Sequence, residues 1–465
     1  MRSFAFGLLV LWFGPAIAYD AVDLAKIAAH FPDADPQDMI KVREGLQILK
    51  KKSQMEHQAA RHEPIVTTED VSVSYGPKSQ DVDVFAVNKD ISDYLYQGDI
   101  VLSPEEVNRM ISGRTKRNTI NGAHYRWETD SAIPIMIDRS VLPKNAQIIR
   151  EALRFWSDNT CLSFQEVNTQ PNGHLLKFIG GGGCSSSVGK QRGPVQTVSI
   201  GTKCGYLGTV LHEVGHALGM HHTQSRYDRD SYVRVDSSNV EEGMWFNFQK
   251  ESRATNENYG VQYDYDAMPR NPRLPTITAL DKYYQKTMGQ RLQVAFSDIW
   301  LINLHHKCDD KCRAYPQISC QNGGYRNPKS CYSCKCPEGF SGQYCATRAG
   351  KTVHTESSAW QTLTGQVGKD VYAEIPEEKA FYHITTQQNR KIQVRINKVG
   401  FKTDRCEYGD LNINMKDPRY VGYRFCDPET DAKGKLLTST GNQVVIKLRS
   451  KFWKQEFSLE YRMGK

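Results

Sequence analysis

The amino-acid sequence predicts a multidomain chain: an α+β domain with a metal-binding helix, a small disulfide-rich module and an all-β sandwich. The first observation is a histidine-rich motif at residues 212–222. The second is a cluster of six cysteines within residues 309–346, and the third is a change to β-rich sequence after residue 350. At 465 residues, the chain has room for about three domains of ordinary size.

The histidine motif spells H-E-x-x-H-x-x-G-x-x-H, the long form of a zinc-peptidase signature. Residues four apart lie on one face of a helix, so His212 and His216 can present two imidazole nitrogens to one tetrahedral ion. Gly219 can take a positive φ and turn the chain back, which brings in His222 as a third ligand. Three protein ligands leave one position for water, and Glu213 is placed to take a proton from that water. A helix that carries histidines by chance is the alternative, but it rarely supplies the glycine and the third histidine as well. We therefore expect one bound Zn²⁺ per chain.

The beginning of the chain predicts secretion. Residues 1–18 have the layout of a signal peptide, with Arg2 before an apolar stretch and Ala18 at the end of a small-residue cleavage site. The apolar stretch is too short to cross a membrane, and no later segment reaches the necessary length. Twelve cysteines, an even number, fit disulfides that form in an oxidising compartment. We therefore expect a secreted, extracellular protein without a membrane span.

The charge pattern excludes one class of partner. The net charge of +8 is modest for this length, and Lys and Arg are dispersed along the chain. The short Lys50–Lys52 run is most simply a solvated helix end. No basic patch with interleaved aromatic residues is present, so nucleic acid is not an expected partner.

Residues 19–117 are interpreted as a removable pro-segment. The stretch has no cysteine, and Asp35-Pro36 predicts the start of a helix that continues with apolar residues at helical spacing. It ends at Arg114-Thr-Lys-Arg117, a dibasic sequence of the kind that processing proteases cut. Any exposed basic cluster could imitate such a site. Its place directly before a new apolar pattern favours cleavage after Arg117.

Residues 118–308 carry the metal motif. The stretch from Lys144 to Trp156 predicts an amphipathic helix, and strands are expected at 162–164 and 175–179. Cys184 and Cys204 bracket the sequence that leads into the metal-binding helix, so we expect them to staple it.

Residues 309–346 form the cysteine cluster. Such a short segment cannot bury a sufficient core and needs disulfides to fold. Six cysteines permit many pairings, so spacing alone does not give the connectivity. A zinc ribbon is the alternative, but the single residue between Cys334 and Cys336 does not suit its paired Cys-x-x-Cys design.

Residues 350–465 change character again. Runs at 392–396, 444–448 and 457–461 are β-rich and are separated by turn residues. This pattern favours an all-β sandwich, with Cys406 and Cys426 as its disulfide.

Taken together, these features resemble the astacin family of zinc endopeptidases, in the nematode-type form that carries EGF-like and CUB domains. The resemblance covers nearly the whole chain. It implies a metzincin-like catalytic domain at 118–308, an EGF-like module at 309–346 and a CUB-like sandwich at 350–465. It also implies that Met268, after Tyr263-Asp-Tyr265, is the Met-turn residue beneath the zinc. The disulfides that it implies are Cys161–Cys308, Cys184–Cys204, Cys312–Cys331, Cys320–Cys334 and Cys336–Cys345.

The resemblance also gives the pro-segment a role. Members of the family place an aspartate from an aromatic-x-Gly-Asp motif on the zinc, where it displaces the catalytic water. Tyr96-Gln-Gly98-Asp99 is similar, so Asp99 is implied as the latency switch that cleavage after Arg117 would release. The alternative is that Gly-Asp only forms a turn before Ile100.

Two departures from the family pattern bear on activity. Thr223 stands where the family has a Glu that helps to bury the mature N-terminus. Met268-Pro-Arg270 stands where the family has His and then Tyr after the methionine, and that Tyr can ligate zinc and stabilise the oxyanion. Loss of one oxyanion donor can lower the rate by about 10²–10³-fold.

Two functional hypotheses follow. The leading one is a latent, secreted zinc endopeptidase that hydrolyses extracellular proteins or matrix, with Glu213 as general base. The alternative is a catalytically weak or silent adhesion protein that retains zinc and binds matrix through its accessory modules, and Thr223 and Arg270 favour it. A complete ligand set together with an intact base favours the enzyme.

Overall fold

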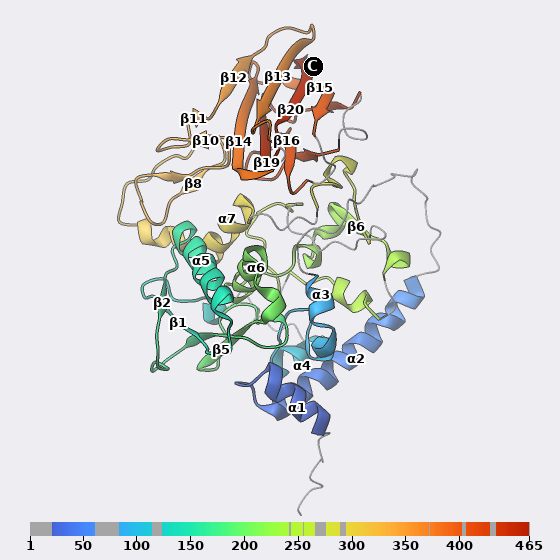
Figure 1. Cartoon of the computed structure of the whole chain (residues 1–465), viewed down its shortest axis with the longest axis vertical. Coiled ribbons are helices and arrows are strands. Elements are labelled where there is room, and N and C mark those ends of the chain that lie inside the picture. Colours follow the sequence, from blue (N-terminus) through green and yellow to red (C-terminus); the bar gives the residue numbers. More distant parts are fainter. Residues whose placement is uncertain are drawn as a thin grey trace, which may run out of the picture.

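A computed structural model of the chain divides into a lower lobe and an upper β-sandwich (Figure 1). The predicted cleavage sites after Ala18 and Arg117 lie outside the described residues, and so do Met268 and Arg270. The structure describes residues 21–60, 83–113, 123–240, 243–253, 255–265, 276–288, 294–371, 373–401, 406–427 and 434–464.

The described part of the predicted pro-segment is helical and packs against one side of the lower lobe (Figure 1). Its helices are α1 (Ala21–His30), α2 (Pro36–Ala60), α3 (Val84–Val87) and α4 (Pro104–Ser112). Helix α2 begins where Asp35-Pro36 predicts, because the Asp35 carboxylate accepts hydrogen bonds from two backbone amides of the first turn. Gly45 lets α2 approach α4, since a Cβ there would lie 2.1 Å from the Val107 side chain.

The centre of the lower lobe is a five-stranded sheet in the order β2-β1-β3-β5-β4. All neighbours are parallel except β4, which runs antiparallel to β5 at the edge. Helices α5 (Pro143–Asn159) and α6 (Leu207–Ala217) pack against each other, and their apolar faces belong to the same buried cluster as the sheet. The strands are β1 (Ile133–Ile137), β2 (Phe164–Glu166), β3 (Leu175–Ile179), β4 (Cys184–Ser186) and β5 (Val195–Ile200).

The strand expected at 162–164 was placed too early. Leu162 is buried, but its amide donates to the Thr160 hydroxyl at 3.2 Å and not to a neighbouring strand. Thr160 in turn bonds the Trp156 carbonyl as α5 ends. The chain therefore first leaves the helix, and sheet pairing begins only at Phe164.

The rest of the lower lobe continues from α6. A short antiparallel pair joins β6 (Val233–Val235) to β7 (Ile277–Ala279), and α7 (Phe296–His305) closes the region. Two disulfides fix it, Cys161–Cys308 and Cys184–Cys204.

A cysteine-rich segment links α7 to the upper sandwich. It contains two small hairpins, and its apolar core is little more than Phe340 and its own cysteines against Val445 of the sandwich. Its disulfides are the pairs that the family resemblance implies: Cys312–Cys331, Cys320–Cys334 and Cys336–Cys345. The hairpin strands are β8 (Tyr325–Arg326), β9 (Cys334–Lys335), β10 (Phe340–Ser341) and β11 (Thr347–Arg348).

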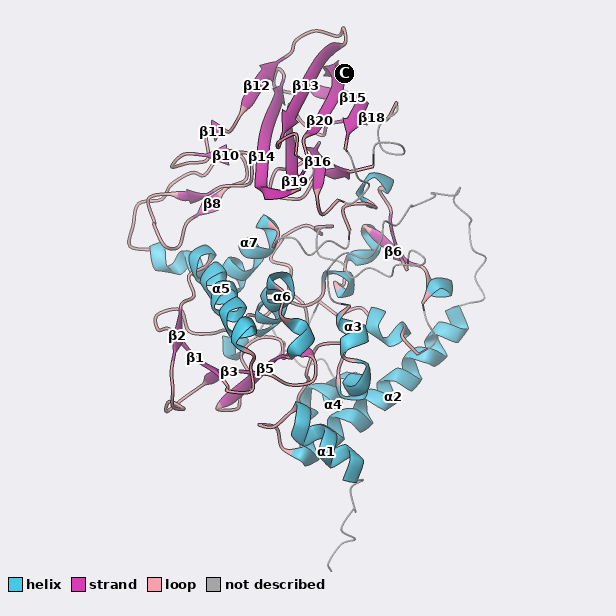
Figure 2. Ribbon diagram, in the orientation of Figure 1, coloured by secondary structure: helices cyan, strands magenta, loops and turns pink. Residues whose placement is uncertain are grey.

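The C-terminal region is a two-sheet β-sandwich (Figure 2). One sheet has the order β12-β14-β19-β16-β17 and the other β13-β20-β15-β18, and the Cys406–Cys426 disulfide connects the ends of two loops. The β-rich runs predicted from sequence lie in β15, β19 and β20. The strands are β12 (Lys351–His354), β13 (Gln361–Val367), β14 (Glu374–Thr385), β15 (Lys391–Gly400), β16 (Gly409–Asn414), β17 (Tyr423–Phe425), β18 (Leu436–Thr438), β19 (Gln443–Phe452) and β20 (Gln455–Gly464).

The sandwich packs directly on the lower lobe through a group of tyrosines. Tyr265 and Tyr284 stack with ring centroids 4.0 Å apart, and Tyr423 of β17 lies 4.7 Å from Tyr284. The Tyr423 hydroxyl donates to the Asp281 carboxylate at 2.8 Å. These rings belong to one buried cluster that includes the inner residues of the sandwich. The two lobes therefore share a core.

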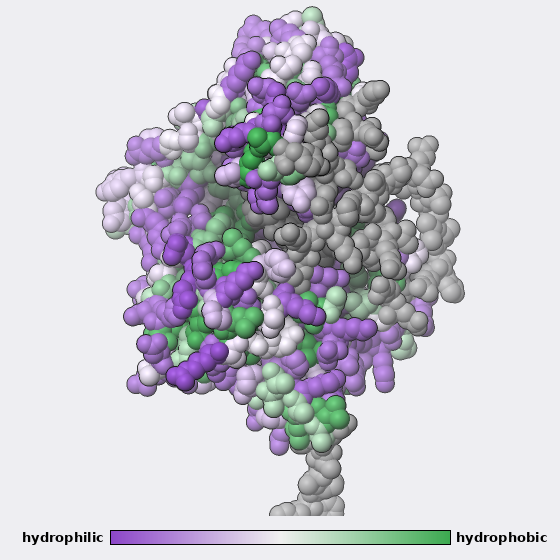
Figure 3. Space-filling model, viewed as in Figure 1, coloured by the Kyte–Doolittle hydropathy of each residue, from purple (hydrophilic) through white to green (hydrophobic). Residues whose placement is uncertain are grey.

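The molecular surface seen in Figure 3 is largely hydrophilic, with apolar residues gathered in smaller groups. One group lies at the lower end, where Figure 1 places α1, and this helix exposes Val22 and Leu24. Within the described ranges, no helix combines the length and the apolar character that a membrane span needs.

Replacing Tyr423 with Ala tests the shared core. The substitution removes a buried aromatic ring from the interface, so we expect the free energy of unfolding to fall by about 3 kcal/mol, measured by urea denaturation. Tyr344→Ala is the control, because that ring is 40% exposed. Equal stability of the two variants would contradict a shared core.

Candidate metal centre

The metal-binding histidines begin on α6, a helix that is buried on nearly every side. Two indole groups hold its carbonyls: Trp156 Nε1 donates to Leu211 O at 3.3 Å, and Trp127 Nε1 donates to Ala217 O at 2.8 Å. The carbonyls of a last helical turn have no partner inside the helix, so the second bond fixes the end of α6. His212 and His216 are thereby carried on a rigid element.

The chain turns sharply at Gly219, directly after α6. This residue has a φ of 106°, a conformation that side chains with a Cβ rarely adopt. A Cβ at this position would also lie 2.7 Å from Nε2 of His305 on α7. His306, the next residue, contacts Leu218 O through its Nε2 at 3.0 Å. The turn therefore requires glycine for both conformation and space, and it returns the chain toward the site at His222.

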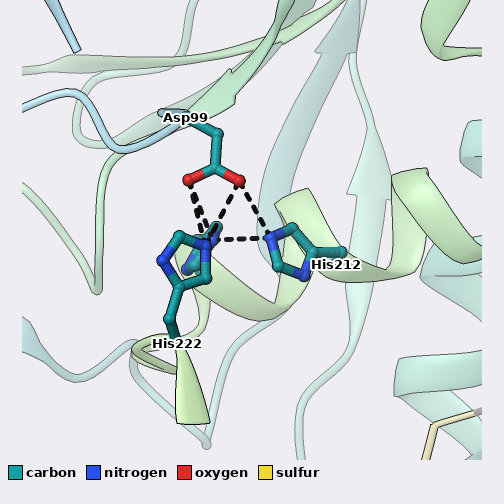
Figure 4. Close-up of side chains that lie close together, drawn as sticks. Asp99, His212 and His222 are labelled. Carbon is teal, nitrogen blue, oxygen red and sulfur yellow. Dashed lines mark hydrogen bonds and ion pairs between the residues drawn. The ribbon is translucent and has the colours of Figure 1, made fainter. Parts of the chain in front are cut away.

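Four side chains converge beyond this turn, as Figure 4 shows for Asp99, His212 and His222. The Nε2 atoms of His212 and His216 are 2.9 Å apart. Asp99 Oδ2 lies 3.2 Å from His212 Nε2, and Asp99 Oδ1 lies 3.1 Å from His222 Nε2. One ligand atom from each of the four residues lies within 4.8 Å of every other. The predicted zinc ligands and the predicted latency switch thus meet at one point.

The four groups fit a tetrahedral zinc ion. Bonds of about 2.0–2.1 Å to nitrogen and oxygen place the ligand atoms of a tetrahedron about 3.3 Å apart, which is close to the distances found here. His216 Nδ1 lies 2.7 Å from Met220 O, and His222 Nδ1 lies 3.1 Å from Gln97 Oε1. Because both acceptors require a proton on Nδ1, each Nε2 keeps its lone pair for the metal.

The electrostatics of the site suit metal binding. Burial and the neighbouring His212 hold the pKa of His216 well below its usual value, so its ring is neutral. Burial on its own would raise the pKa of Asp99. The charge of His222 and the hydrogen bonds from His212 and His222 lower the Asp99 pKa well below its usual value. A neutral imidazole and an ionised carboxylate are the forms that bind zinc.

Asp99 reaches the histidines on a tight loop. Tyr96 and Ile100 exchange two backbone hydrogen bonds of 2.8 and 3.0 Å, and Gly98 between them has a φ of 94°. The loop is joined to the sheet edge, because Ser186 of β4 donates its amide to Asp99 O and accepts from the amide of Val101, both at 3.0 Å. The Gly-Asp pair therefore does form a turn, and that turn carries the carboxylate to the site.

Comparison with known proteins places this geometry in a family. The family model for astacin, which describes a family of peptidases, matches residues 119–307. The zinc metalloproteinase nas-29 of Caenorhabditis elegans is 32% identical over 437 residues, and the match covers 84% of this chain and 80% of that protein. The chain belongs to the astacin family. It is a zinc metalloendopeptidase, and the His212, His216 and His222 set is suited to hold its zinc.

Two further comparisons cover different shares of the chain. The zinc metalloproteinase nas-31 of the same organism is 34% identical over 397 residues, which is 80% of this chain but 64% of that protein. Among solved structures, the hatching enzyme HCE-1 from Oryzias latipes has 29% identity and a TM-score of 0.35, and it covers 39% of this chain and 94% of its own.

The structure adds residues that sequence reasoning missed. Gln97 is fully buried, and its Oε1 contacts His222 Nδ1 and accepts from the Ser225 hydroxyl at 2.8 Å. Tyr96 donates its hydroxyl to the Glu251 carboxylate at 2.9 Å. No local pattern pairs these residues, because more than a hundred positions separate the partners in each case. Glu213 is buried on α6, and Thr223 is half-buried where the short turn Thr223–Ser225 begins.

Gly219→Ala tests the turn. The added Cβ is strained at this φ and meets His305, so we expect His222 to be displaced and the zinc content of the purified chain to fall below one ion per chain. Stability should also fall by more than about 1 kcal/mol. Gly441→Ala is the matched control, since a Cβ there has open space. Unchanged zinc stoichiometry and melting temperature in Gly219→Ala would contradict this account.

Proposed function

We propose that the chain is a latent, secreted zinc endopeptidase that hydrolyses extracellular proteins or matrix once residues 19–117 are cut away after Arg117. The observation that carries the proposal is the contact between the Asp99 carboxylate and the Nε2 atoms of His212 and His222, at 3.1–3.2 Å. Asp99 belongs to the segment that processing would remove, whereas the histidines belong to the part that would remain.

Latency follows from where the carboxylate lies. A catalytic zinc site has three protein ligands and keeps its fourth position for water. Asp99 supplies a fourth ligand atom beside the three imidazoles. While it stays there, no position is left for the water that attacks the substrate. Removal of the pro-segment would therefore create the active site without any change in the histidines.

After processing, Glu213 would carry the proton transfers. Zinc, when bound to the three histidines, polarises the substrate carbonyl and lowers the pKa of a water molecule. Glu213 follows His212 on the buried helix α6, so the same helix turn that presents the ligand also carries the carboxylate. We assign to Glu213 the roles of accepting the proton of the attacking water and passing it to the leaving amine.

Secretion and the accessory modules complete the proposal. The six disulfides leave no free cysteine, which fits an oxidising compartment. We propose that residues 309–346 are an EGF-like module and residues 350–465 a CUB-like domain that together position the peptidase on its protein substrates. The alternative of a silent adhesion protein is less well supported, because the site keeps its complete ligand set and Glu213.

Asp99→Ala tests the latency switch. We combine it with Arg117→Ala so that processing is blocked, and we expect the unprocessed chain to gain peptide-hydrolysing activity of about tenfold or more, since each 1.4 kcal/mol lost from the latent state is a factor of ten. Asp93→Ala in the same background is the control, because this pro-segment carboxylate lies on the surface and pairs with Lys50. If both chains stay equally inactive, Asp99 is not the switch.

Glu213→Gln tests the general base in the processed enzyme. We expect kcat to fall by about 10²–10⁴-fold while zinc stoichiometry is unchanged, because the amide cannot accept the proton. Glu151→Gln, at an exposed position of α5, should retain full activity. The hydrolysis that remains in wild-type enzyme should disappear with a chelator and return with added zinc. A Glu213→Gln enzyme that keeps wild-type turnover would remove this residue from the mechanism.

A further inference from the structure

The pro-segment loop places a second side chain next to the metal centre. Tyr96 lies three positions before Asp99, and its ring is buried. The ring packs edge-on against Phe246, with centroids 5.4 Å apart, and its hydroxyl donates to Glu251 Oε1 at 2.9 Å. Phe246 and Glu251 lie in the peptidase domain and would remain after processing.

Glu251 is held close to the third zinc ligand. Its amide donates to Ser225 O at 2.6 Å, and Ser225 lies three residues after His222. The side chain is buried, and the one other ionisable group recorded beside it, His221, has its Nδ1 4.0 Å from Glu251 Oε1. The Tyr96 hydroxyl is therefore the main hydrogen-bond donor that the structure gives this carboxylate.

Removal of the pro-segment would change the surroundings of Glu251. A carboxylate in a sheltered place needs hydrogen-bond donors, because loss of a donor leaves its charge poorly solvated. Once Tyr96 has gone, a donor must come from water or from a bound substrate. Phe246 supplies an apolar wall next to the carboxylate. A side chain with an apolar body and a donor at its tip satisfies both features at once.

We propose that Phe246 and Glu251 form a specificity subsite of the processed enzyme, and that this subsite takes a substrate side chain with an apolar body and a terminal hydrogen-bond donor, tyrosine above all. Tyr96 fills the subsite in the latent chain while Asp99 fills the metal centre. The loop thus blocks two parts of the substrate-binding surface at once. The inference rests on the proposed function, since it concerns the substrate of that same site.

The test uses the processed full-length enzyme and a positional series of peptides in which one residue at a time near the cleaved bond is Tyr or Phe. At one position we expect kcat/KM to be about ten to a hundred times higher for Tyr, as a hydrogen bond to a buried charged group warrants. Cleavage of casein in the same preparation reports the proposed function separately. Casein cleavage with equal rates for Tyr and Phe at every position would overturn the subsite and leave the peptidase intact.

Two substitutions assign the preference to Glu251. In Glu251→Leu the Tyr/Phe ratio should fall to about one, whereas Glu251→Gln keeps an acceptor and should retain much of it. If Lys or Arg is also preferred at this position, that preference should be lost in Glu251→Gln, because it depends on the charge. An unchanged Tyr/Phe ratio in Glu251→Leu would overturn the proposal.

A synthetic peptide of residues 92–103 gives a test that needs no variant enzyme. It should inhibit processed wild-type enzyme about ten times better than the same peptide with Tyr96→Phe. Equal inhibition by the two peptides would overturn the proposal, even if the Glu251 variants fail to fold.

Discussion

The structure depends on one constraint: three imidazole nitrogens must meet at a point although the third lies beyond the end of the helix that carries the first two. An α-helix supplies His212 and His216 from one face, but it cannot supply His222 without a sharp reversal. Gly219 makes the reversal possible, and it does so because α7 approaches so closely that His305 leaves no room for a Cβ. The ligand geometry is thus set by how α6 and α7 pack.

The pro-segment loop is shaped to match that site. Its backbone extends the edge of the sheet at β4, and its positive-φ residues Gln97 and Gly98 turn the chain so that Asp99 faces the histidines. Gln97 accepts from the same groups that hold His222 in place, so the loop supports the metal centre as well as blocking it. A segment with these contacts is stable only while it is joined to the rest of the chain, which is why cleavage after Arg117 would be an effective trigger.

Local sequence pattern predicted the parts of the structure that depend on near neighbours. The spacing from His212 to His222 predicted the ligand set, Asp35-Pro36 predicted the start of α2, and the β-rich runs predicted three of the sandwich strands. The strand near 162 was misplaced because the Thr160 hydroxyl takes up the Leu162 amide, an interaction that alternation of apolar residues does not reveal.

Contacts between distant residues could not be predicted in the same way. The Gln97–His222 and Tyr96–Glu251 pairs span 125 and 155 positions, and nothing in the sequence around either partner marks the other. The packing of the sandwich on the peptidase domain is of the same kind. Asp264 accepts from the Ser297 hydroxyl at 2.6 Å and from the amide of Val421 in the sandwich at 3.3 Å, and Tyr420 accepts from the Gln262 amide. These contacts fix the end of the segment that leads toward residue 268, while residues 256–262 of the same segment line a cavity beside Gly219. The sandwich is therefore part of the framework around the metal centre, and its role in the enzyme includes holding the peptidase domain in shape.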